Sequence, residues 1–159
     1  MSKTIQWPKA KMIVFAALAT VMSTAAFAVD NMESKDAPDL TSVRTKIKAK
    51  DFKAAIVDLR GFVEAGVQHA DVFNLLGFSY RKSGDRETGA TYYRKALDFD
   101  PNHKGALEYQ GELFVELGDI PKAKANLVKL LALCPSGCEE REDLEKAIAG
   151  AAAVAPKTN

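Results

Sequence analysis

The sequence predicts an all-α fold built from a helical hairpin that recurs about three times, and three observations predict it. Residues 70–103 align with residues 104–137 at a constant offset of 34 positions. The Gly-Asp pair at positions 84 and 85 recurs at positions 118 and 119. Within each unit, the apolar residues before and after the Gly-Asp pair recur at intervals of three and four, as on one face of an α-helix. A fixed period of this length is typical of arrays whose units bury their apolar faces only against one another.

The stretch from Ala70 to His103 has the most regular pattern. Its first half has a large-large-small-large series, its second half has a small-large-small series, and a proline closes it. These residues are Phe73, Leu76, Gly77 and Tyr80, then Gly89, Tyr93 and Ala96, and finally Pro101. On these residues the stretch resembles the tetratricopeptide repeat (TPR) along its whole length. The resemblance implies two antiparallel helices per unit, a TPR-type α-solenoid, and a concave groove lined chiefly by the first helix of each unit.

The other units are less regular. The first has Val43 where Gly77 stands and Lys46 where Tyr80 stands, although Leu40, Val43 and Ile47 keep a helical spacing. After the third unit, acidic residues begin a segment whose apolar residues again have helical spacing, which predicts a capping helix. We expect a TPR domain at residues 39–155, with repeats at about 36–69, 70–103 and 104–137, a capping helix at about 139–155 and a tail at 156–159.

The N-terminus has the pattern of an export signal. Three lysines, at positions 3, 9 and 11, precede a mostly apolar run from Met12 to Met22. Ala26-Phe27-Ala28 then has the small-x-small form of a cleavage site. The run is shorter than the ~20 residues of a membrane-spanning helix, so cleavage near Ala28 is favoured over an uncleaved membrane anchor. We expect a signal peptide at 1–28, a flexible lead-in at 29–38, and a periplasmic or secreted bacterial protein that meets the membrane only if the signal is not cleaved.

Composition and motifs narrow the function. The chain of 159 residues is 27% charged with a formal net charge of +1, which gives no support to nucleic-acid binding. It contains no Gly-rich phosphate loop, no Gly-x-Ser-x-Gly motif and no identifiable pair of catalytic acids. We therefore expect no enzyme activity, catalytic residue, cofactor or metal. The TPR resemblance implies a protein or peptide partner instead.

The resemblance also identifies the side chains that would face the groove. The first unit contributes Arg44, Ile47 and Lys48; the second contributes Asn74, Phe78, Arg81 and Lys82; the third contributes Glu108, Tyr109, Glu112, Val115 and Glu116. An aromatic pair beside arginine and asparagine is typical of a peptide-binding hot spot. Family members that clamp the C-terminal carboxylate of chaperones use Lys, Asn and Arg at set positions. Only Arg44 could serve in such a clamp here, so that mode is not supported.

Cys134 and Cys138 are the other candidate site. Cα atoms four residues apart on a helix lie about 6 Å from each other, within the reach of a disulfide. An exported protein would keep such a bond oxidised, where it would fix the turn before the capping helix. The alternative is a thiol-redox or metal-carrier protein centred on these cysteines. The spacing is not Cys-x-x-Cys, and only His69 and His103 could add histidine ligands, so we favour a structural disulfide.

The sequence therefore predicts an exported TPR interaction scaffold that is monomeric or weakly self-associating. We expect Phe78 and Tyr109 to lie at the centre of its partner-binding groove. End-to-end stacking of the array is a further possibility, since the capping helix would protect only one end.

Overall fold

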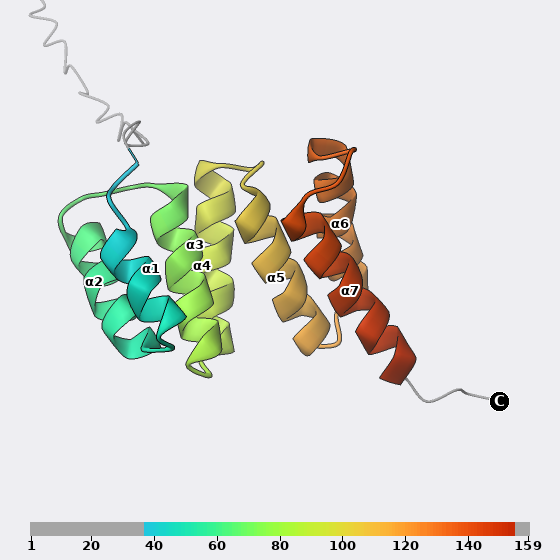
Figure 1. Ribbon diagram of the computed structural model, residues 1–159, viewed down its shortest axis with the longest axis horizontal. Coiled ribbons are helices and arrows are strands. Elements are labelled where there is room, and N and C mark those ends of the chain that lie inside the picture. Colours follow the sequence, from blue (N-terminus) through green and yellow to red (C-terminus); the bar gives the residue numbers. More distant parts are fainter. Residues whose placement is uncertain (1–36, 155–159) are drawn as a thin grey trace, which may run out of the picture. The chain divides into compact units, whose positions relative to one another are not determined.

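The computed structural model describes residues 37–154, and within them it consists of seven α-helices and no strands (Figure 1). The helices, in order, are α1 (Thr41–Lys48), α2 (Phe52–Glu64), α3 (Ala70–Lys82), α4 (Arg86–Phe99), α5 (Lys104–Glu116), α6 (Ile120–Leu133) and α7 (Glu139–Val154). The expected signal peptide, most of the lead-in and the C-terminal tail lie outside the described residues. The fold is the expected all-α TPR-type solenoid.

The helices pack in sequence order. Within each hairpin, α1 packs on α2, α3 on α4, and α5 on α6, and each hairpin meets the next through α2–α3 and α4–α5 contacts. Helix α7 packs against both α5 and α6, as the first helix of a further hairpin would. The odd-numbered helices are therefore the first helices of successive hairpins, and we call the surface they share the first-helix surface.

Two kinds of side-chain N-cap recur at the starts of the helices. The side chains of Asp51, Asp85 and Asp119 each accept a backbone N–H three residues later, and so cap α2, α4 and α6. The rings of His69 and His103 do the same for α3 and α5, accepting from the N–H of Asp71 and of Ala106 through Nδ1. These two histidines thus serve as N-caps.

The turn before each second helix needs a left-handed residue. Gly84 and Gly118 have φ of +100° and +76°, and the equivalent residue of the first unit, Lys50, has φ of +60°. Glycine adopts this conformation freely, whereas a side chain makes it unfavourable. The first unit therefore makes the same turn as the others with a less suitable residue.

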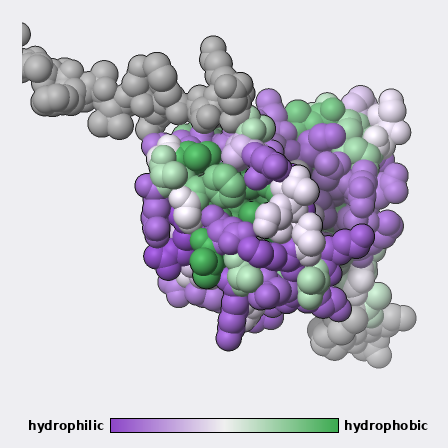
Figure 2. Space-filling view, turned by 60° about the vertical axis from the view of Figure 1, so that its left-hand side comes forward, coloured by the Kyte–Doolittle hydropathy of each residue, from purple (hydrophilic) through white to green (hydrophobic). Residues whose placement is uncertain are grey.

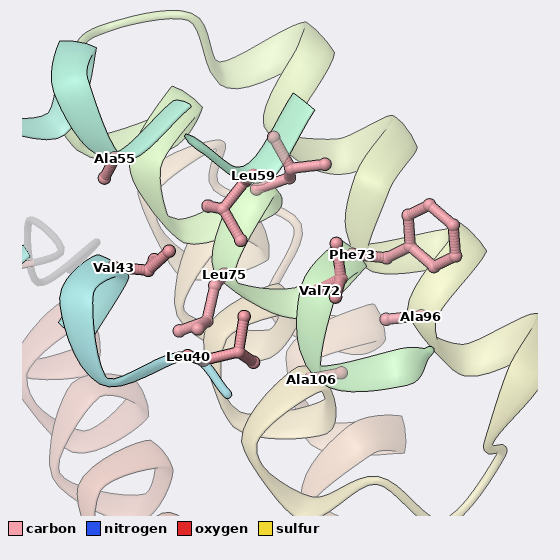
Figure 3. Packing of buried hydrophobic residues seen from close by; sticks show 10 residues of the cluster. Leu40, Val43, Ala55, Leu59, Val72, Phe73, Leu75, Ala96 and Ala106 are labelled. Atoms are coloured by element: carbon pink, nitrogen blue, oxygen red, sulfur yellow. The ribbon is translucent and has the colours of Figure 1, made fainter. Parts of the chain in front are cut away.

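The apolar core runs along the stack in two clusters. The larger joins α1, α2, α3 and α4, with Ala106 of α5 at its edge (Figure 3). The smaller joins α5, α6 and α7 through Leu107, Leu130 and Leu144, and Leu97 packs against both. The two clusters thus bury the apolar faces of every hairpin against a neighbour.

Small residues allow the closest helix contacts. A Cβ placed on Gly77 would lie 2.6 Å from the ring of Tyr93 on α4, so only glycine fits there. A Cβ on Gly111, the equivalent residue of α5, would lie 2.6 Å from Leu144 of α7. The glycine at this repeat position therefore makes room for a side chain of α4 in one hairpin and for a side chain of α7 in the next.

Candidate functional site

Phe78 and Tyr109 lie together on the first-helix surface. Their ring centroids are 4.8 Å apart, with the planes tilted by 49°. Phe52, at the start of α2, lies edge-on to Phe78 at 6.2 Å, and the Lys82 ammonium lies 5.4 Å from the Phe78 centroid. Both Phe78 and Tyr109 are half-buried, so part of each ring remains accessible. Phe52 extends this aromatic cluster and was missed because it belongs to a second helix.

Arg81 forms a bridge between α3 and α5. Its side chain is only 4% exposed, and its Nη1 and Nη2 donate to Glu112 at 2.7 Å and to Glu116 at 2.8 Å. Arg86 adds a second contact to Glu116, from Nε at 3.0 Å. Burial disfavours the charged guanidinium, but the hydrogen bonds to Glu116 and Glu112 outweigh burial and raise the pKa of Arg81. The expected groove residues Arg81, Glu112 and Glu116 therefore pair with one another. Their role in binding a partner stays a prediction.

A polar pocket of about 290 Å³ lies next to the aromatic pair. It is the point at which four odd-numbered helices, or the turns before them, contribute to one site. The lining residues are Arg44, Asp71, Asn74, Leu75, His103, Gly105, Glu108, Tyr109, Glu139, Glu140 and Asp143. The pocket thus brings together Arg44, Asn74 and Tyr109 of the expected groove, and it adds acidic residues of α7 that the sequence suggested only as helix-start charge.

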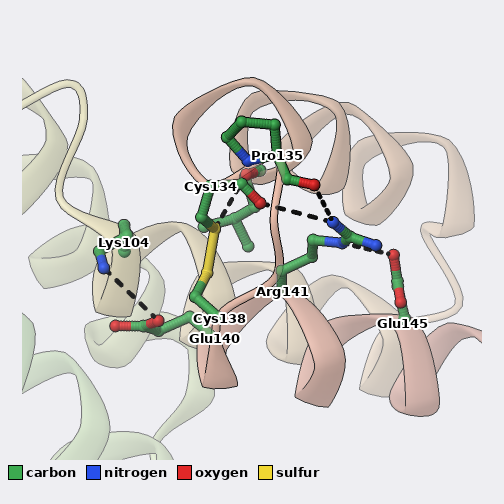
Figure 4. Close-up of a disulfide and its surroundings, with 8 residues drawn as sticks. Lys104, Cys134, Pro135, Cys138, Glu140, Arg141 and Glu145 are labelled. Carbon is green, nitrogen blue, oxygen red and sulfur yellow. Dashed lines mark hydrogen bonds and ion pairs between the residues drawn. A yellow bond between two sulfur atoms is a disulfide. The ribbon is translucent and has the colours of Figure 1, made fainter.

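Some of the pocket's charges are paired within the chain. Asp71 accepts from Nε2 of His103 at 3.1 Å and lies 3.9 Å from Nη2 of Arg44. The hydrogen bond from His103, with some opposition from burial, lowers the pKa of Asp71. Glu140 lies 3.9 Å from the Lys104 ammonium (Figure 4). These pairs join the successive first helices at the edge of the pocket.

Glu108 is different, because most of the residue is buried while its carboxyl group has no partner within the described residues. It is 7% exposed, and among residues 37–154 its carboxyl group forms no hydrogen bond and no ion pair. Burial, followed by the negative charges of Glu112, Asp143, Glu140 and Glu139, raises its pKa to about 8. Asn74, 5% exposed, likewise keeps its Oδ1 without a hydrogen-bond partner in the described part of the chain. Two acceptors without a partner in the described part of the chain thus lie in the lining of one acidic pocket, and of these the Asn74 Oδ1 is fully buried.

Tyr109 connects the pocket to the aromatic cluster. Its ring packs on Phe78, and the same residue lines the pocket. Burial and the neighbouring Glu108 and Glu112 raise its pKa to about 12, so its hydroxyl remains protonated at neutral pH. The accessible face of Tyr109 therefore offers an apolar surface that leads to a negatively charged hollow.

Cys134 and Cys138 lie at bonding distance, with Cα atoms 6.0 Å apart (Figure 4). Arg141, on the first turns of α7, donates to the carbonyl oxygens of Cys134 and Pro135 at 3.4 and 3.2 Å and to Glu145 at 3.0 Å. Arg141 therefore holds the turn between α6 and α7, and the cysteine pair lies across the same turn. Because Glu139 and Glu140 follow Cys138 directly, this turn also positions one wall of the pocket.

No helix between residues 37 and 154 is long and apolar enough to cross a membrane. Within the same residues, no cluster of three or more His, Cys, Asp or Glu side chains has a geometry that could hold a metal ion.

The helix order and the shared first-helix surface define the class, an all-α solenoid of TPR type. A sequence model of the tetratricopeptide repeat matches residues 70–103. The chain is 33% identical over 64 residues to the uncharacterized protein ycf37 of Pyropia yezoensis, and 30% identical over 67 residues to the protein of that name in Porphyra purpurea. These alignments cover 40% and 42% of the chain but only 36% and 39% of the relatives. A TPR unit supports a general role in protein interaction, and proteins with such repeats are typically not enzymes.

The end of the stack formed by α1 and α2 has a different character. Figure 2 looks toward this end and shows apolar surface enclosed by hydrophilic side chains. Val43 and Phe62 are among the residues that line a hollow of about 430 Å³ between the two helices. Val57, elsewhere on α2, is 69% exposed. No preceding hairpin covers α1 among the described residues, which accounts for this apolar surface.

Proposed function

We propose that the chain is an interaction scaffold that binds a peptide segment or helix of another protein along the first-helix surface, with Phe78 and Tyr109 at the centre. The observation that carries the proposal is the contact between these two half-buried rings, from different hairpins, on the surface shared by the first helices. Aromatic side chains supply large contact areas at low entropic cost and dominate many interfaces. Binding of this kind needs no cofactor.

The test removes the two rings and measures partner capture. The double variant Phe78→Ala/Tyr109→Ala is immobilised beside the parent chain and exposed to the periplasmic fraction of the source cells. A matched control, Tyr92→Ala/Phe114→Ala, also removes one tyrosine and one phenylalanine, both half-buried, from outside the aromatic cluster and the pocket. We expect capture by the parent and the control but not by the test variant, with equal helicity by circular dichroism. Equal capture by both variants would mean that the interface does not include Phe78 and Tyr109.

We also propose that the chain is exported and that signal cleavage leaves Val29 as the mature N-terminus. The lysines before the apolar run and the Ala26-Phe27-Ala28 sequence support this proposal. Mass spectrometry of the chain recovered from each cell fraction tests it. A periplasmic or secreted chain that begins at Val29 is expected, and substitution of Ala26 and Ala28 by leucine should block processing. A chain that begins at Met1 in the cytosol would contradict export.

In the same compartment we expect Cys134 and Cys138 to be joined and structural. The Cα separation of 6.0 Å and the hydrogen bonds of Arg141 around the turn support this role. Thiol titration of the denatured mature chain should find no free thiol before reduction and two after it. A bond that exchanges rapidly with millimolar glutathione, or copper or zinc bound in proportion to the thiols, would favour the thiol-redox or metal-carrier alternative.

A further inference from the structure

The pocket between the odd-numbered helices has a large excess of negative charge. Five of its lining residues are acidic, and Arg44 is the basic one besides the cap His103. Arg44 and His103 already contact Asp71, and Lys104 contacts Glu140 from outside the lining. Lys146 pairs with Asp143 on the exposed side of α7. Glu108 and Glu139 remain without an ion pair among the described residues, so no basic group of that part of the chain matches either carboxyl group.

Burial distinguishes this pocket from an ordinary acidic surface. The Glu108 side chain belongs to a residue that is 93% buried, and neither a hydrogen bond nor a cation of the described chain satisfies it. The Oδ1 of Asn74, in the same lining, is fully buried and has no hydrogen-bond partner among the described residues. Buried polar groups in folded proteins are nearly always paired, because an unpaired one is unfavourable by about 1–3 kcal/mol. A positively charged donor in the pocket could satisfy the Asn74 Oδ1 and pair with the Glu108 carboxylate.

The surroundings indicate what kind of cation would fit. A metal ion is not favoured, since the described residues present no cluster with metal-binding geometry. Tyr109 lines the pocket, and its ring also packs on Phe78. Lysine and arginine side chains combine an apolar stem with a charged head, so the stem can lie on an aromatic ring while the head enters a polar site. The volume of about 290 Å³ leaves room for such a head.

We propose that this pocket receives a lysine or arginine side chain of the peptide partner, with Glu108 as the principal counter-charge and Asn74 and Glu139 as further acceptors. The inference rests on the proposed function, because it names the kind of residue that the bound segment places beside the aromatic pair. The N-terminal residues of α7 would then form part of the binding site as well as cover the last hairpin. Partners without a basic residue at this position would bind more weakly.

The experiment uses small probes of known chemistry, since the partner is unidentified. The amides of N-acetyl-lysine, N-acetyl-arginine and N-acetyl-norleucine are titrated into the full ¹⁵N-labelled chain at millimolar concentration, and amide shifts are followed by NMR. Norleucine has nearly the shape of lysine without its charge. We expect the two basic probes to shift the amides of Asn74, Glu108 and Glu139 saturably and the neutral probe not to do so. The stronger of the two identifies the preferred head group.

Glu108→Gln is the test variant and Glu142→Gln the matched control. Both replace a carboxyl group by an amide of the same size, but Glu142 is exposed on α7 and does not line the pocket. We expect Glu108→Gln to weaken the basic probes at least tenfold and Glu142→Gln to weaken them less than twofold. Equal shifts by all three probes, or equal binding by both variants, would overturn the inference. If the partner is still captured through Phe78 and Tyr109 in that case, the proposed function stands without it.

Discussion

Replacing Glu108 by glutamine should stabilise the free chain above neutral pH. The carboxyl group keeps its proton up to about pH 8 in the folded chain, whereas its ordinary pKa of 4.5 applies in the unfolded chain. Between these values the folded state binds more protons than the unfolded state. The free energy of unfolding contributed by this group therefore falls as the pH rises from about 4.5 to about 8. Glutamine does not titrate, so the free energy of unfolding of the variant does not fall for this reason.

The size of the effect follows from the same interval. At about 1.4 kcal/mol per pH unit the upper limit is about 5 kcal/mol, and solvent entering the pocket reduces it to about 2 kcal/mol. Other charged or ionisable groups also face Glu108, and comparison with the parent cancels most of their contribution. They are Glu112 on α5, Glu139, Glu140 and Asp143 on α7, Asp71 and His103 at the ends of α3 and α5, and Arg44 on α1.

Urea unfolding followed by circular dichroism at pH 4.5 and at pH 9 measures the difference. We expect equal free energies of unfolding at the lower pH and an advantage of about 2 kcal/mol for Glu108→Gln at the higher pH. Glu142→Gln, at an exposed position, should match the parent at both pH values. A variant less stable than the parent at pH 9 would refute the reasoning, because it would mean that the ionised Glu108 has a stabilising partner.

Three further predictions concern stability. Lys50→Gly should raise the free energy of unfolding by about 1 kcal/mol in urea, because it relieves the left-handed backbone at φ +60°; a decrease would contradict this. Arg81→Met should lower it by about 2 kcal/mol, since Glu112 would lose its buried partner, and Arg81→Lys should recover only part; equal stability would show that the bridge is not needed. Cys134→Ser/Cys138→Ser should lower the midpoint of thermal unfolding by an amount corresponding to about 2 kcal/mol, matching the parent chain in reductant.

The repeat period and the helix starts could be predicted from the sequence because they depend on local residues. The Gly-Asp turns and the 34-residue offset require only neighbours in the chain, and the TPR match at residues 70–103 falls on the same stretch. Irregular positions were harder to interpret. Lys46 replaces an aromatic residue, and in the structure it pairs with Asp58 of α2. Asp58 lies twelve residues further along the chain, and the repeat pattern does not indicate that it would pair with Lys46.

The irregular Val43 has a similar explanation. It stands where Gly77 stands in the next unit, and it is 1% exposed in the core. Gly77 makes room for Tyr93, whereas the residue equivalent to Tyr93 in the first unit is the smaller Leu59, which lies in the same core cluster as Val43. A small-large pair is thus replaced by two medium side chains of similar total volume, which a core tolerates.

The groove residues illustrate what a family resemblance cannot supply. It indicates which side chains share a surface, but not which of them are already paired. Arg81 is buried against two carboxylates, while Glu108, from the same set of positions, has no ion-pair partner among the described residues. The acidic lining contributed by α7 depends on how that helix packs on α5, which follows from tertiary contacts rather than from the repeat pattern.

The unpaired Glu108 links the stability of the free chain to the binding of a basic group. A lysine head group that enters the pocket interacts best with the ionised carboxylate, so binding must release the proton that Glu108 holds below about pH 8. The affinity for N-acetyl-lysine amide should therefore increase up to about tenfold between pH 7 and pH 8.5, a range in which the probe itself stays charged. Glu108→Gln should bind weakly and with little dependence on pH, whereas Glu142→Gln should follow the parent. An affinity that stays constant over this range in the parent would mean that Glu108 is already ionised before binding, and the destabilisation assigned to it would then require another source.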